Sequence, residues 1–181
     1  TVVFNCDEEV GSHSSRELIE DEARNARAVL VFEPSIAGGR AKTSRSGVAN
    51  YDVRVAGRAA HAGVDPEKGI SAIGVAADIV TRVHALNDLG NGLSLNVGVI
   101  SGGTRSNVVA AAAEMEIDVR FRTIAQANDV HRAIRALGGE RNGAEVTISG
   151  GMNRPPFERT PAVVELYERA AEAARQSGFE M

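Results

Sequence analysis

Hydrophobic and charged residues alternate most strictly over "AEMEIDVRFR", residues 113–122. Every second position is apolar, and the positions between carry acids or arginines. A period of two is typical of a β-strand with one face buried and the other facing water or a cleft. The stretch "YDVRV", residues 51–55, alternates in the same way, and "LSLNVGVI" and "AEVTISG" predict two further strands.

Two stretches between these strands have the apolar spacing of helices. The first follows Asp65 at a cap position and Pro66 at the first helical position. The second runs from about Asn128 to Leu137 and ends at a Gly-Gly pair. The expected buried positions are Ile70, Ile73, Ala77, Val80 and Val83 in the first helix and Val130, Ile134 and Leu137 in the second. Residues 47–150 therefore follow the order β-α-β-β-α-β, which predicts a ferredoxin-like sheet with two helices on one face.

The N-terminal pattern is different. Apolar runs at residues 1–4 and 28–33 predict two buried strands, and residues 16–27 between them have helical spacing. Strand, helix and strand in this order are typical of a βαβ unit in a parallel sheet. Residues 35–46 have no periodicity and read as a linker, and residues 161–177 form an amphipathic helix that we expect to return to the first layer.

The fold class that follows is α/β with an inserted α+β domain. We expect a partial α/β domain over residues 1–45, the inserted ferredoxin-like domain over 46–154, and a helix returning to the first domain over 155–181. The first residue is not Met and lies inside a predicted strand. We therefore expect the 181 residues to be a section of a longer protein.

The composition excludes several classes of partner and site. The formal net charge is −4 and aromatic residues make up 4%, with no Trp. Nucleic-acid binding needs concentrated positive charge or stacking aromatics, so we expect no nucleic-acid partner. A single cysteine excludes an internal disulfide and a cysteine-based zinc site. No apolar run has the length of a membrane span, so we expect no membrane partner. The expected compartment is the cytoplasm, with a periplasmic or secreted protein as the alternative.

Three consecutive acids follow the first predicted strand. Glu8 and Glu9 lie where ligands gather in open α/β sheets, at the carboxyl end of a strand. Adjacent side chains leave a loop in different directions, so one carboxylate can bind a metal while the other reaches a water beside it. The alternative is an acidic loop that stabilises the N-terminus of the next helix through its dipole.

Two other positions are candidates for the same site. Glu33 ends the second predicted strand, so parallel strands would place it at the same rim as Glu8 and Glu9. An unpaired carboxylate at a buried edge is costly, although a solvated strand end is the alternative. His61 lies in "GRAAHAG", where small neighbours leave room for a ligand or another chain. A lone histidine is more often structural.

Two polar groups of the inserted domain remain open in role. The turn "SGGTRSNVV" presents Asn107 before an apolar run and is weak evidence by itself. Arg120 follows three acids on the polar face of its strand. It can pair with those acids, which is the default, or hold a substrate carboxylate as a bidentate fork.

Taken together, these stretches resemble the M20 family of metallopeptidases. The matching stretches are "DEEVGSHSSR", "VFEPS", "SRSGVANYDVRVAGRAAHAG", "SGGTRSNVV" and "EIDVRFR", in the order of the family. The family includes glutamate carboxypeptidase, acetylornithine deacetylase, succinyl-diaminopimelate desuccinylase and aminoacylase. The first and second stretches are most similar to the glutamate carboxypeptidase branch.

The resemblance implies a role for each candidate residue. Glu8 would be the general base that deprotonates a metal-bridging water, and Glu9 and Glu33 would each ligate one of two zinc ions, with cobalt or manganese as alternatives. His61 would reach into the active site of a partner subunit and stabilise the oxyanion. The implied substrate contacts are made by Asn107, Arg120 and Arg45.

The resemblance also implies a dimer and a substrate class. The inserted domain would be the dimerisation or lid domain of a homodimer, and residues 1–45 part of the catalytic domain. The reaction would be hydrolysis of an amide or peptide bond next to a carboxylate-bearing amino acid, in a small peptide or N-acyl amino acid. The alternatives are a deacylase or desuccinylase of the same family and a non-catalytic dimerisation module.

The chain departs from the family in its metal ligands. The family also uses an upstream histidine, an upstream bridging aspartate and a C-terminal histidine, and none of them is in this sequence. His13, His84 and His131 do not match those positions and are interpreted as surface or structural residues. We therefore expect this section of the enzyme to be inactive alone and to bind metal weakly.

Overall fold

The computed structural model describes residues 1–33 and 39–180 and divides the chain into two compact units. Unit 1 comprises Thr1–Lys42 and Pro161–Met181, and unit 2 comprises Thr43–Thr160. Pro34, which directly follows the predicted strand 28–33, and residues 35–38 of the predicted linker lie outside the described residues. None of the described helices has the length and apolar character needed to cross a membrane.

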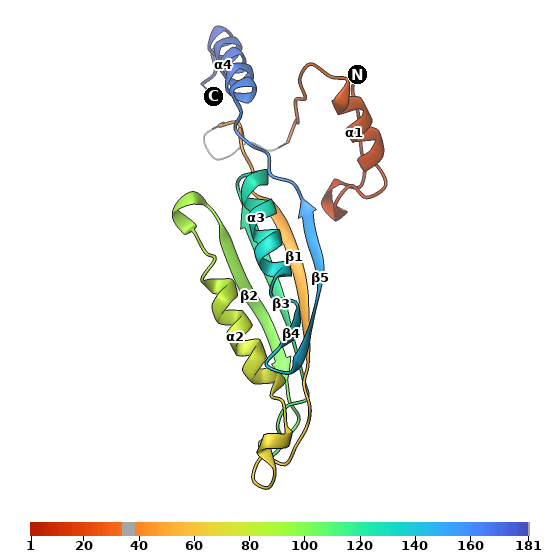
Figure 1. Cartoon of the computed structure of the whole chain (residues 1–181). Helices are drawn as coiled ribbons and strands as arrows, with labels where there is room; N and C mark the ends of the chain where they lie inside the picture. Colours follow the sequence, from red (N-terminus) through yellow and green to blue (C-terminus); the bar gives the residue numbers. More distant parts are fainter. Residues whose placement is uncertain (34–38, 181) are drawn as a thin grey trace. The chain divides into compact units, whose positions relative to one another are not determined.

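Unit 2 is a five-stranded antiparallel sheet with two helices, α2 (Ala72–His84) and α3 (Ile124–Arg135), packed against it (Figure 1). The strands lie in the order β2-β3-β1-β5-β4. Their bounds are β1 Gly47–Ala56, β2 Ser94–Gly102, β3 Ala112–Phe121, β4 Gly139–Arg141 and β5 Ala144–Arg154. The mixed α/β class is confirmed, and the short β4 strand is an addition to the predicted order.

The core lies on one face of this sheet, where the helices cover it. The five alternating apolar residues of β3 are each at most 2% exposed, as the sequence predicts. On the neighbouring β1 strand, Tyr51, Val53 and Val55 are buried in the same register. The opposite face of both strands carries exposed polar and charged residues. One covered face therefore sets the register of the whole sheet.

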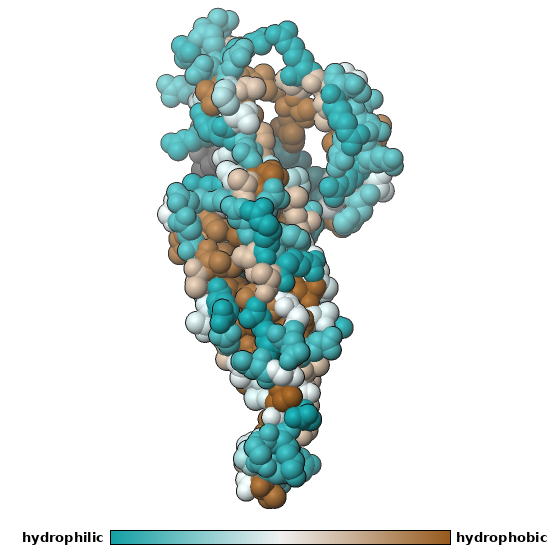
Figure 2. Space-filling model, viewed as in Figure 1, coloured by the Kyte–Doolittle hydropathy of each residue, from teal (hydrophilic) through white to brown (hydrophobic). Residues whose placement is uncertain are grey.

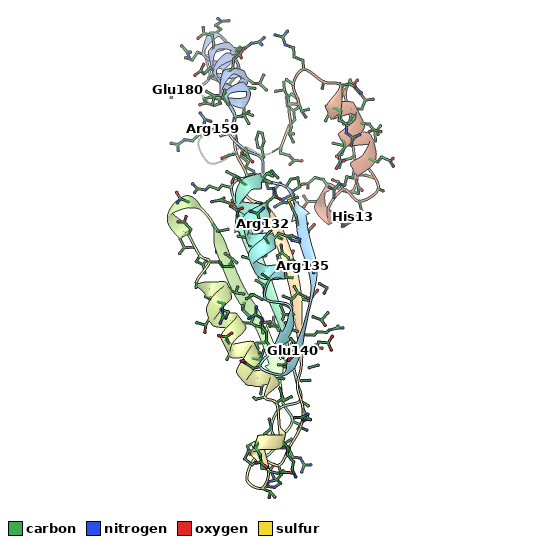
Figure 3. All side chains as sticks on the ribbon, in the orientation of Figure 1. His13, Arg132, Arg135, Glu140, Arg159 and Glu180 are labelled. Atoms are coloured by element: carbon green, nitrogen blue, oxygen red, sulfur yellow. The ribbon has the colours of Figure 1, made fainter. Side chains whose placement is uncertain are left out.

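Helix α3 begins four residues before the predicted start because of a capping box. The Thr123 side chain accepts the N–H of Gln126, and the Gln126 side chain accepts the N–H of Thr123. On the same helix, Arg135 donates to the backbone carbonyls of Ile148 and Gly150 on β5 (Figure 3). These contacts fix α3 over β5, and its predicted buried residues Val130 and Ile134 are in the core.

Helix α2 buries part of the predicted face together with residues that were not predicted. Asp65 and Pro66 begin a short 3-10 helix, η2 (Pro66–Lys68), and α2 itself starts after Ser71, whose hydroxyl accepts the N–H of Gly74. The buried residues are Ala72, Val75, Ala76, Ile79 and Val83. Ile73, which was predicted to be buried, is 46% exposed. Val83 is buried as predicted, and Ile70 and Val80 are partly buried against the core, so the prediction is wrong for Ile73 and Ala77. Helix α2 is apolar on two sides, so spacing alone could not select every residue that packs.

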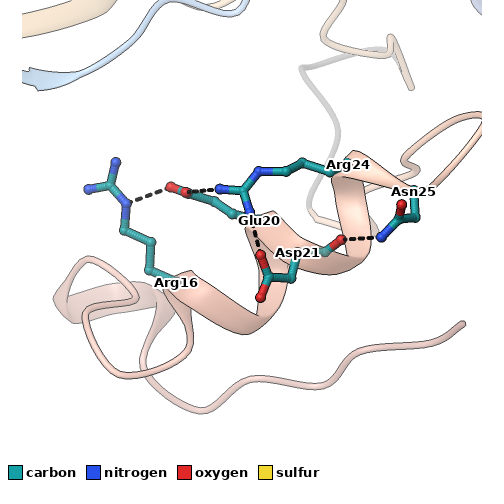
Figure 4. A network of polar contacts seen from close by, with 5 residues as sticks. All are labelled: Arg16, Glu20, Asp21, Arg24 and Asn25. Atoms are coloured by element: carbon teal, nitrogen blue, oxygen red, sulfur yellow. Dashed lines mark hydrogen bonds and ion pairs between the residues drawn. The ribbon is translucent and has the colours of Figure 1, made fainter.

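Unit 1 contains two helices, α1 (Arg16–Arg24) and α4 (Pro161–Gln176), and a 3-10 turn, η1 (Glu8–Val10). Helix α1 is hydrophilic on the face that Figure 2 shows, and an ion-pair network of Arg16, Glu20, Asp21 and Arg24 runs along it (Figure 4). The Arg16 guanidinium lowers the pKa of Glu20 by hydrogen bonding and by its charge. This network is solvent-exposed and stabilises the helix without forming a site.

The two strands predicted in unit 1 are absent from its described residues, which corrects the sequence analysis. Residues 1–4 and 28–33 are extended but pair with no strand. Phe4 and Phe32 are 95% and 93% exposed, so these segments bury nothing within the unit. A strand exists through hydrogen bonds to its neighbours, and parallel strands need cover on both faces. The described part of unit 1 supplies neither.

We predict that Ile134→Ala destabilises unit 2 by about 2–5 kcal/mol, because the removed atoms leave a cavity in a closed core. Ile134 is 0% exposed. Urea unfolding followed by circular dichroism measures the change. Ile124→Ala removes the same atoms from the same helix at a 40% exposed position and is the matched control. Equal losses in the two variants would contradict the assignment of Ile134 to the core.

Candidate active site

The acidic loop of unit 1 is held by Asp7. The two carboxylate oxygens of Asp7 accept hydrogen bonds from the side chains of Ser15 at 2.6 Å and Ser14 at 2.7 Å, and from the backbone N–H of Ser14 at 2.8 Å. The chain reverses through Gly11 at φ 98°, a conformation that favours glycine. Asp7 is therefore occupied in closing the loop.

These hydrogen bonds favour the ionised form of Asp7. The donors hold the pKa of this carboxyl well below its usual range, with the Ser15 and Ser14 hydroxyls as the largest causes. Because the folded pKa is lowered, the loop contacts are present above the ordinary pKa of an aspartate and are lost only as the pH falls toward the folded value.

Glu8 and Glu9 lie in η1, inside the loop that Asp7 closes. Both side chains are exposed, and neither makes a hydrogen bond or ion pair among the residues that the structure describes. Glu33 ends the extended segment 28–33 and is also exposed. The sheet rim expected to bring Glu33 beside Glu8 and Glu9 does not form in the described part of unit 1, because its two strands do not form.

The described residues do not complete a metal site. Glu9 and Glu33 have carboxylate oxygens, which are suitable zinc ligands. Within residues 1–33 and 39–180, however, no group of three or more His, Cys, Asp or Glu side chains is placed to hold a metal ion. The chain offers carboxylate ligands without the full set that a zinc ion needs.

His61 and Asn107 are brought together in unit 2. They lie on two loops at one end of the sheet, where β1 ends and β3 begins (Figure 1). The N–H of Ala62 donates to the carbonyl of Asn107 at 3.0 Å, and the N–H of Val109 donates to the carbonyl of Ala60 at 2.9 Å. Both candidate side chains are therefore carried by paired backbone, although they are far apart in the sequence.

The loop that carries His61 closes on itself. The Arg58 side chain donates to the carbonyl of Lys68 at 2.6 Å, and the backbones of Arg58 and Ile70 pair. A Cβ on Gly57 would lie 2.2 Å from the carbonyl of Ile70, so glycine is needed there for this close approach. An open depression beside His61 is lined by Arg58, Asp65, Glu67 and Lys68 among others. Gly57, one of the small residues near His61, is thus needed for the close approach that closes the loop.

Arg120 and Arg45 lie at the opposite end of the sheet. Arg120 is paired in register with Val48 and Ser94, eight residues along β3 from the end near His61. At about 3.4 Å per residue this is roughly 27 Å. Arg45 pairs its backbone with Phe157 at the same end. Within one copy of unit 2, the predicted site residues therefore form two groups.

Arg120 has a partner in the structure. Its guanidinium donates two hydrogen bonds to Asp118, at 2.8 and 3.0 Å, and Asn50 donates to the same carboxylate at 3.3 Å. Pairing with an acid is thus the arrangement seen. The pair is 49% and 38% exposed, so solvent reaches both side chains and a competing carboxylate can displace Asp118.

The remaining histidines make structural contacts. The Nε2 of His84 accepts the N–H of Val97 at 3.3 Å, and the Nδ1 of His131 is 3.0 Å from the Tyr51 hydroxyl. Burial raises the pKa of Tyr51, which lines a cavity of about 210 Å³ under α3 together with His131 and Phe121. His13 lies beside Gly11 in the acidic loop (Figure 3). None of the predicted site residues lines this cavity.

Sequence reasoning missed one residue of the His61 loop. Asp65 was interpreted only as a helix cap, yet its carboxylate accepts the backbone N–H of His61 at 3.2 Å. The spacing of four residues within a Gly- and Ala-rich loop was the available signal. It is too common in loops to have been decisive.

Comparison with known proteins identifies relatives of the whole chain. A family profile described as a peptidase dimerisation domain matches residues 43–146. Carboxypeptidase G2 from Pseudomonas sp. (strain RS-16) is 34% identical over 98% of this chain and 44% of its own length. A probable carboxypeptidase of Arthroderma otae is 31% identical over 85% of this chain and 37% of its own. The chain thus spans less than half the length of these relatives.

Solved structures agree with the fold. The aminobenzoyl-glutamate utilization protein from Klebsiella pneumoniae is 28% identical, with a TM-score of 0.57, over 70% of this chain and 34% of its own. A Staphylococcus aureus tripeptidase superposes over 96% of this chain and 46% of its own with a TM-score of 0.70, and at 23% identity it supports the fold alone. The dimerisation-domain match covers more than half of the chain. The chain belongs to the M20 peptidase family.

Proposed function

We propose that this chain is part of an M20 hydrolase that cleaves an amide or peptide bond next to a carboxylate-bearing amino acid. Similarity to carboxypeptidase G2 over nearly the whole chain supports a carboxypeptidase. The structural observation that carries the proposal is the backbone pairing that brings His61 and Asn107 to one end of the sheet. A dimerisation domain without catalysis would have no need to join these two polar side chains.

Glu8 is the general base of the proposed reaction. Its exposed carboxylate takes a proton from the attacking water and passes it to the nitrogen of the leaving amine. His61 donates a hydrogen bond to the oxyanion that develops on the scissile carbonyl, and Asn107 binds the substrate beside it. Asp7 takes no part in the chemistry, because its oxygens hold the loop that carries Glu8.

The proposal includes two zinc ions in the complete enzyme, with cobalt or manganese as alternatives. Glu9 and Glu33 would each contribute to one of them. Such ions would supply Lewis-acid polarisation of the carbonyl and of the attacking water when bound. The described residues form no group of three ligands, so the proposal takes the other ligands from the rest of the enzyme. This section of the enzyme is therefore proposed to be inactive alone.

The proposed enzyme is a homodimer. In it, His61 and Arg120 of one copy contact two different substrate molecules, one in each of the two active sites. Arg120 lies roughly 27 Å along β3 from the end of the sheet near His61, which exceeds the length of a small peptide substrate. His61 and Asn107 would complete the site of the partner copy, and Arg120, with Arg45 at the same end, would hold the substrate carboxylate in the copy's own site. Asp118 would release Arg120 to that carboxylate.

The edge strand β2 is the proposed contact between the copies. It is the last strand of the sheet on one side and is nine residues long, whereas β4 at the other side has three. Val99 and Ile100 on β2 are 52% and 53% exposed, and Ile73 adds apolar surface on α2. A long apolar edge strand pairs readily with another strand unless it is protected.

A second candidate function is an amidase that acts on N-carbamoyl or other N-acyl amino acids. A hydantoinase/carbamoylase family amidase from Burkholderia ambifaria is 26% identical over 76% of this chain and 34% of its own, with a TM-score of 0.58. This alternative, like a deacylase or desuccinylase, differs in the group bonded to the amino acid. The roles of Glu8, His61 and Arg120 would be unchanged.

Glu8→Gln in the full-length enzyme tests the proposed function. Turnover of N-acyl-glutamate and dipeptide substrates is expected to fall by about 10²–10⁴-fold, because the amide cannot accept the proton. Glu22→Gln changes an exposed glutamate of α1 and is the matched control. Unchanged turnover in Glu8→Gln would remove Glu8 as the base, and a comparison of the substrates separates the carboxypeptidase from the amidase.

Ile100→Lys tests the dimer contact. A buried lysine at an edge strand opposes pairing, so the dissociation constant is expected to rise at least tenfold in sedimentation equilibrium. Thr147→Lys places the same charge at an exposed position of β5, which lies between two strands, and is the control. A dimer that is unaffected by Ile100→Lys would exclude the β2 edge as the contact.

The Asp7 loop is expected to resist acid. Hydrogen-exchange protection of the Ser14 and Ser15 amides should persist down to about pH 4, because the Asp7 pKa lies below its usual value, and should be lost only in stronger acid. In Asp7→Ala this protection should be absent at every pH. Loss of protection between pH 6 and pH 5 in the unchanged chain would contradict the role of Asp7.

A further inference from the structure

The backbone on both sides of the His61 imidazole is fixed by Asp65. Asp65 occupies the N-cap of η2, but its side chain does not cap the backbone of that turn. Its Oδ1 instead accepts the N–H of His61 at 3.2 Å, and its own N–H donates back to the carbonyl of His61 at 3.1 Å. Lys68 pairs with the other carboxylate oxygen at 3.2 Å. The Asp65 carboxylate is thus turned away from capping and toward the histidine.

The imidazole ring itself is held by a second contact. The backbone N–H of Gly63 donates to Nδ1 of His61 at 3.1 Å. A nitrogen that accepts a hydrogen bond carries no proton, so the neutral ring has its proton on Nε2. Among the described residues Nε2 has no hydrogen-bond partner, and His61 is exposed. The ring therefore presents an N–H donor to the outside of the loop.

We propose that the Gly63 N–H and the Asp65 carboxylate are positioning groups that hold His61 as an Nε2–H donor before substrate arrives. The inference rests on the proposed role of His61 as a donor to the oxyanion. A donor fixed in place and in tautomer needs no reorganisation when negative charge develops. All the groups involved lie within residues 61–68, so the device is complete within one copy of the chain.

His84 provides an internal comparison. Its Nε2 accepts the N–H of Val97, so its neutral ring carries the proton on Nδ1. The structure thus assigns opposite tautomers to two histidines of the same unit. An experiment on one sample can therefore measure the proposed state and its opposite together.

Long-range ¹H–¹⁵N correlation spectra of the ¹⁵N-labelled chain, at a pH where the rings are neutral, measure the tautomers directly. We expect a protonated Nε2 and an unprotonated Nδ1 for His61, and the reverse for His84. A His61 ring that is protonated on Nδ1, or that shows the tautomer mixture of free imidazole, would overturn the proposal. This result does not depend on activity.

Two substitutions at residue 63 separate the effect of losing the backbone N–H from the effect of adding a side chain. Gly63→Pro removes the donor, and the His61 ring is expected to revert to the tautomer mixture of free imidazole. Gly63→Ala keeps the donor, and its Cβ would lie at an ordinary 3.6 Å from the His61 ring. It should leave the tautomer unchanged. A fixed Nε2–H tautomer in Gly63→Pro would show that another group sets it.

Asp65 is tested in the full-length enzyme by the split between kcat and KM. Asp65→Ala is expected to lower kcat by roughly 10–100-fold with little change in KM. A donor displaced by a fraction of an ångström stabilises the oxyanion of the transition state less well, whereas binding of the substrate is hardly weakened. Asp65→Asn retains an oxygen that can accept the His61 N–H and should recover most of the rate. Asp88 occupies the equivalent N-cap of η3 (Leu89–Asn91), and Asp88→Ala is the control.

The outcomes separate the proposed role of His61 in the reaction from the proposed role of Gly63 and Asp65 in positioning it. One outcome is unchanged turnover in the His61→Ala enzyme together with spectra of the unsubstituted chain that show the Nε2–H tautomer of His61. In that case the proposed function of His61 fails and the positioning of its ring stands. If His61→Ala abolishes turnover while Asp65→Ala has the same kcat as the unchanged enzyme, Asp65 is not a positioning residue. An equal loss in Asp65→Asn and Asp65→Ala would also exclude the proposed contact.

Discussion

Unit 2 depends on the burial of one face of its sheet. The apolar residues of β3 are in its middle, and their apolar neighbours on β1, with Leu95 on β2, are buried only in the register that keeps the polar residues of β3 outside. A slip of one residue would place five apolar side chains in water and as many charged or polar ones under the helices. The alternation on β3 therefore fixes the pairing of the whole sheet, and the pairing fixes which loops meet at each end.

The length of the sheet has a functional consequence. β1 and β3 are paired over ten residues each, so their ends are too far apart for one small substrate to reach both. The residues that the family resemblance implies for the site are divided between these ends, His61 and Asn107 at one and Arg120 and Arg45 at the other. A sheet of this kind acts as a spacer, and a site that needs both groups has to draw them from two copies. The unprotected β2 edge offers a place for the second copy to pair.

The parts that could be predicted from the sequence are those in which local pattern and burial agree. The strict alternation of β3 leaves one possible face, and Val130 and Ile134 of α3 lie on the side predicted for them. Helix α2 is apolar on two sides, so the sequence could not show which side meets the sheet and which side meets water or another copy. The N-terminal runs are apolar enough for strands, but a strand requires a neighbour, and no spacing within a sequence supplies one.

The loops that carry candidate site residues are held by short-range contacts, whereas the sheet is held by pairing between distant parts of the sequence. Both loops are closed by short-range contacts, from Asp7 to Ser14 and Ser15 in unit 1 and from His61 to Asp65 in unit 2. These contacts join residues that are close in the sequence, so the acidic loop is closed although Phe4, three residues before Asp7, is 95% exposed. The local geometry of each loop is thus set by contacts within that loop, and it needs no contribution from the core of the sheet.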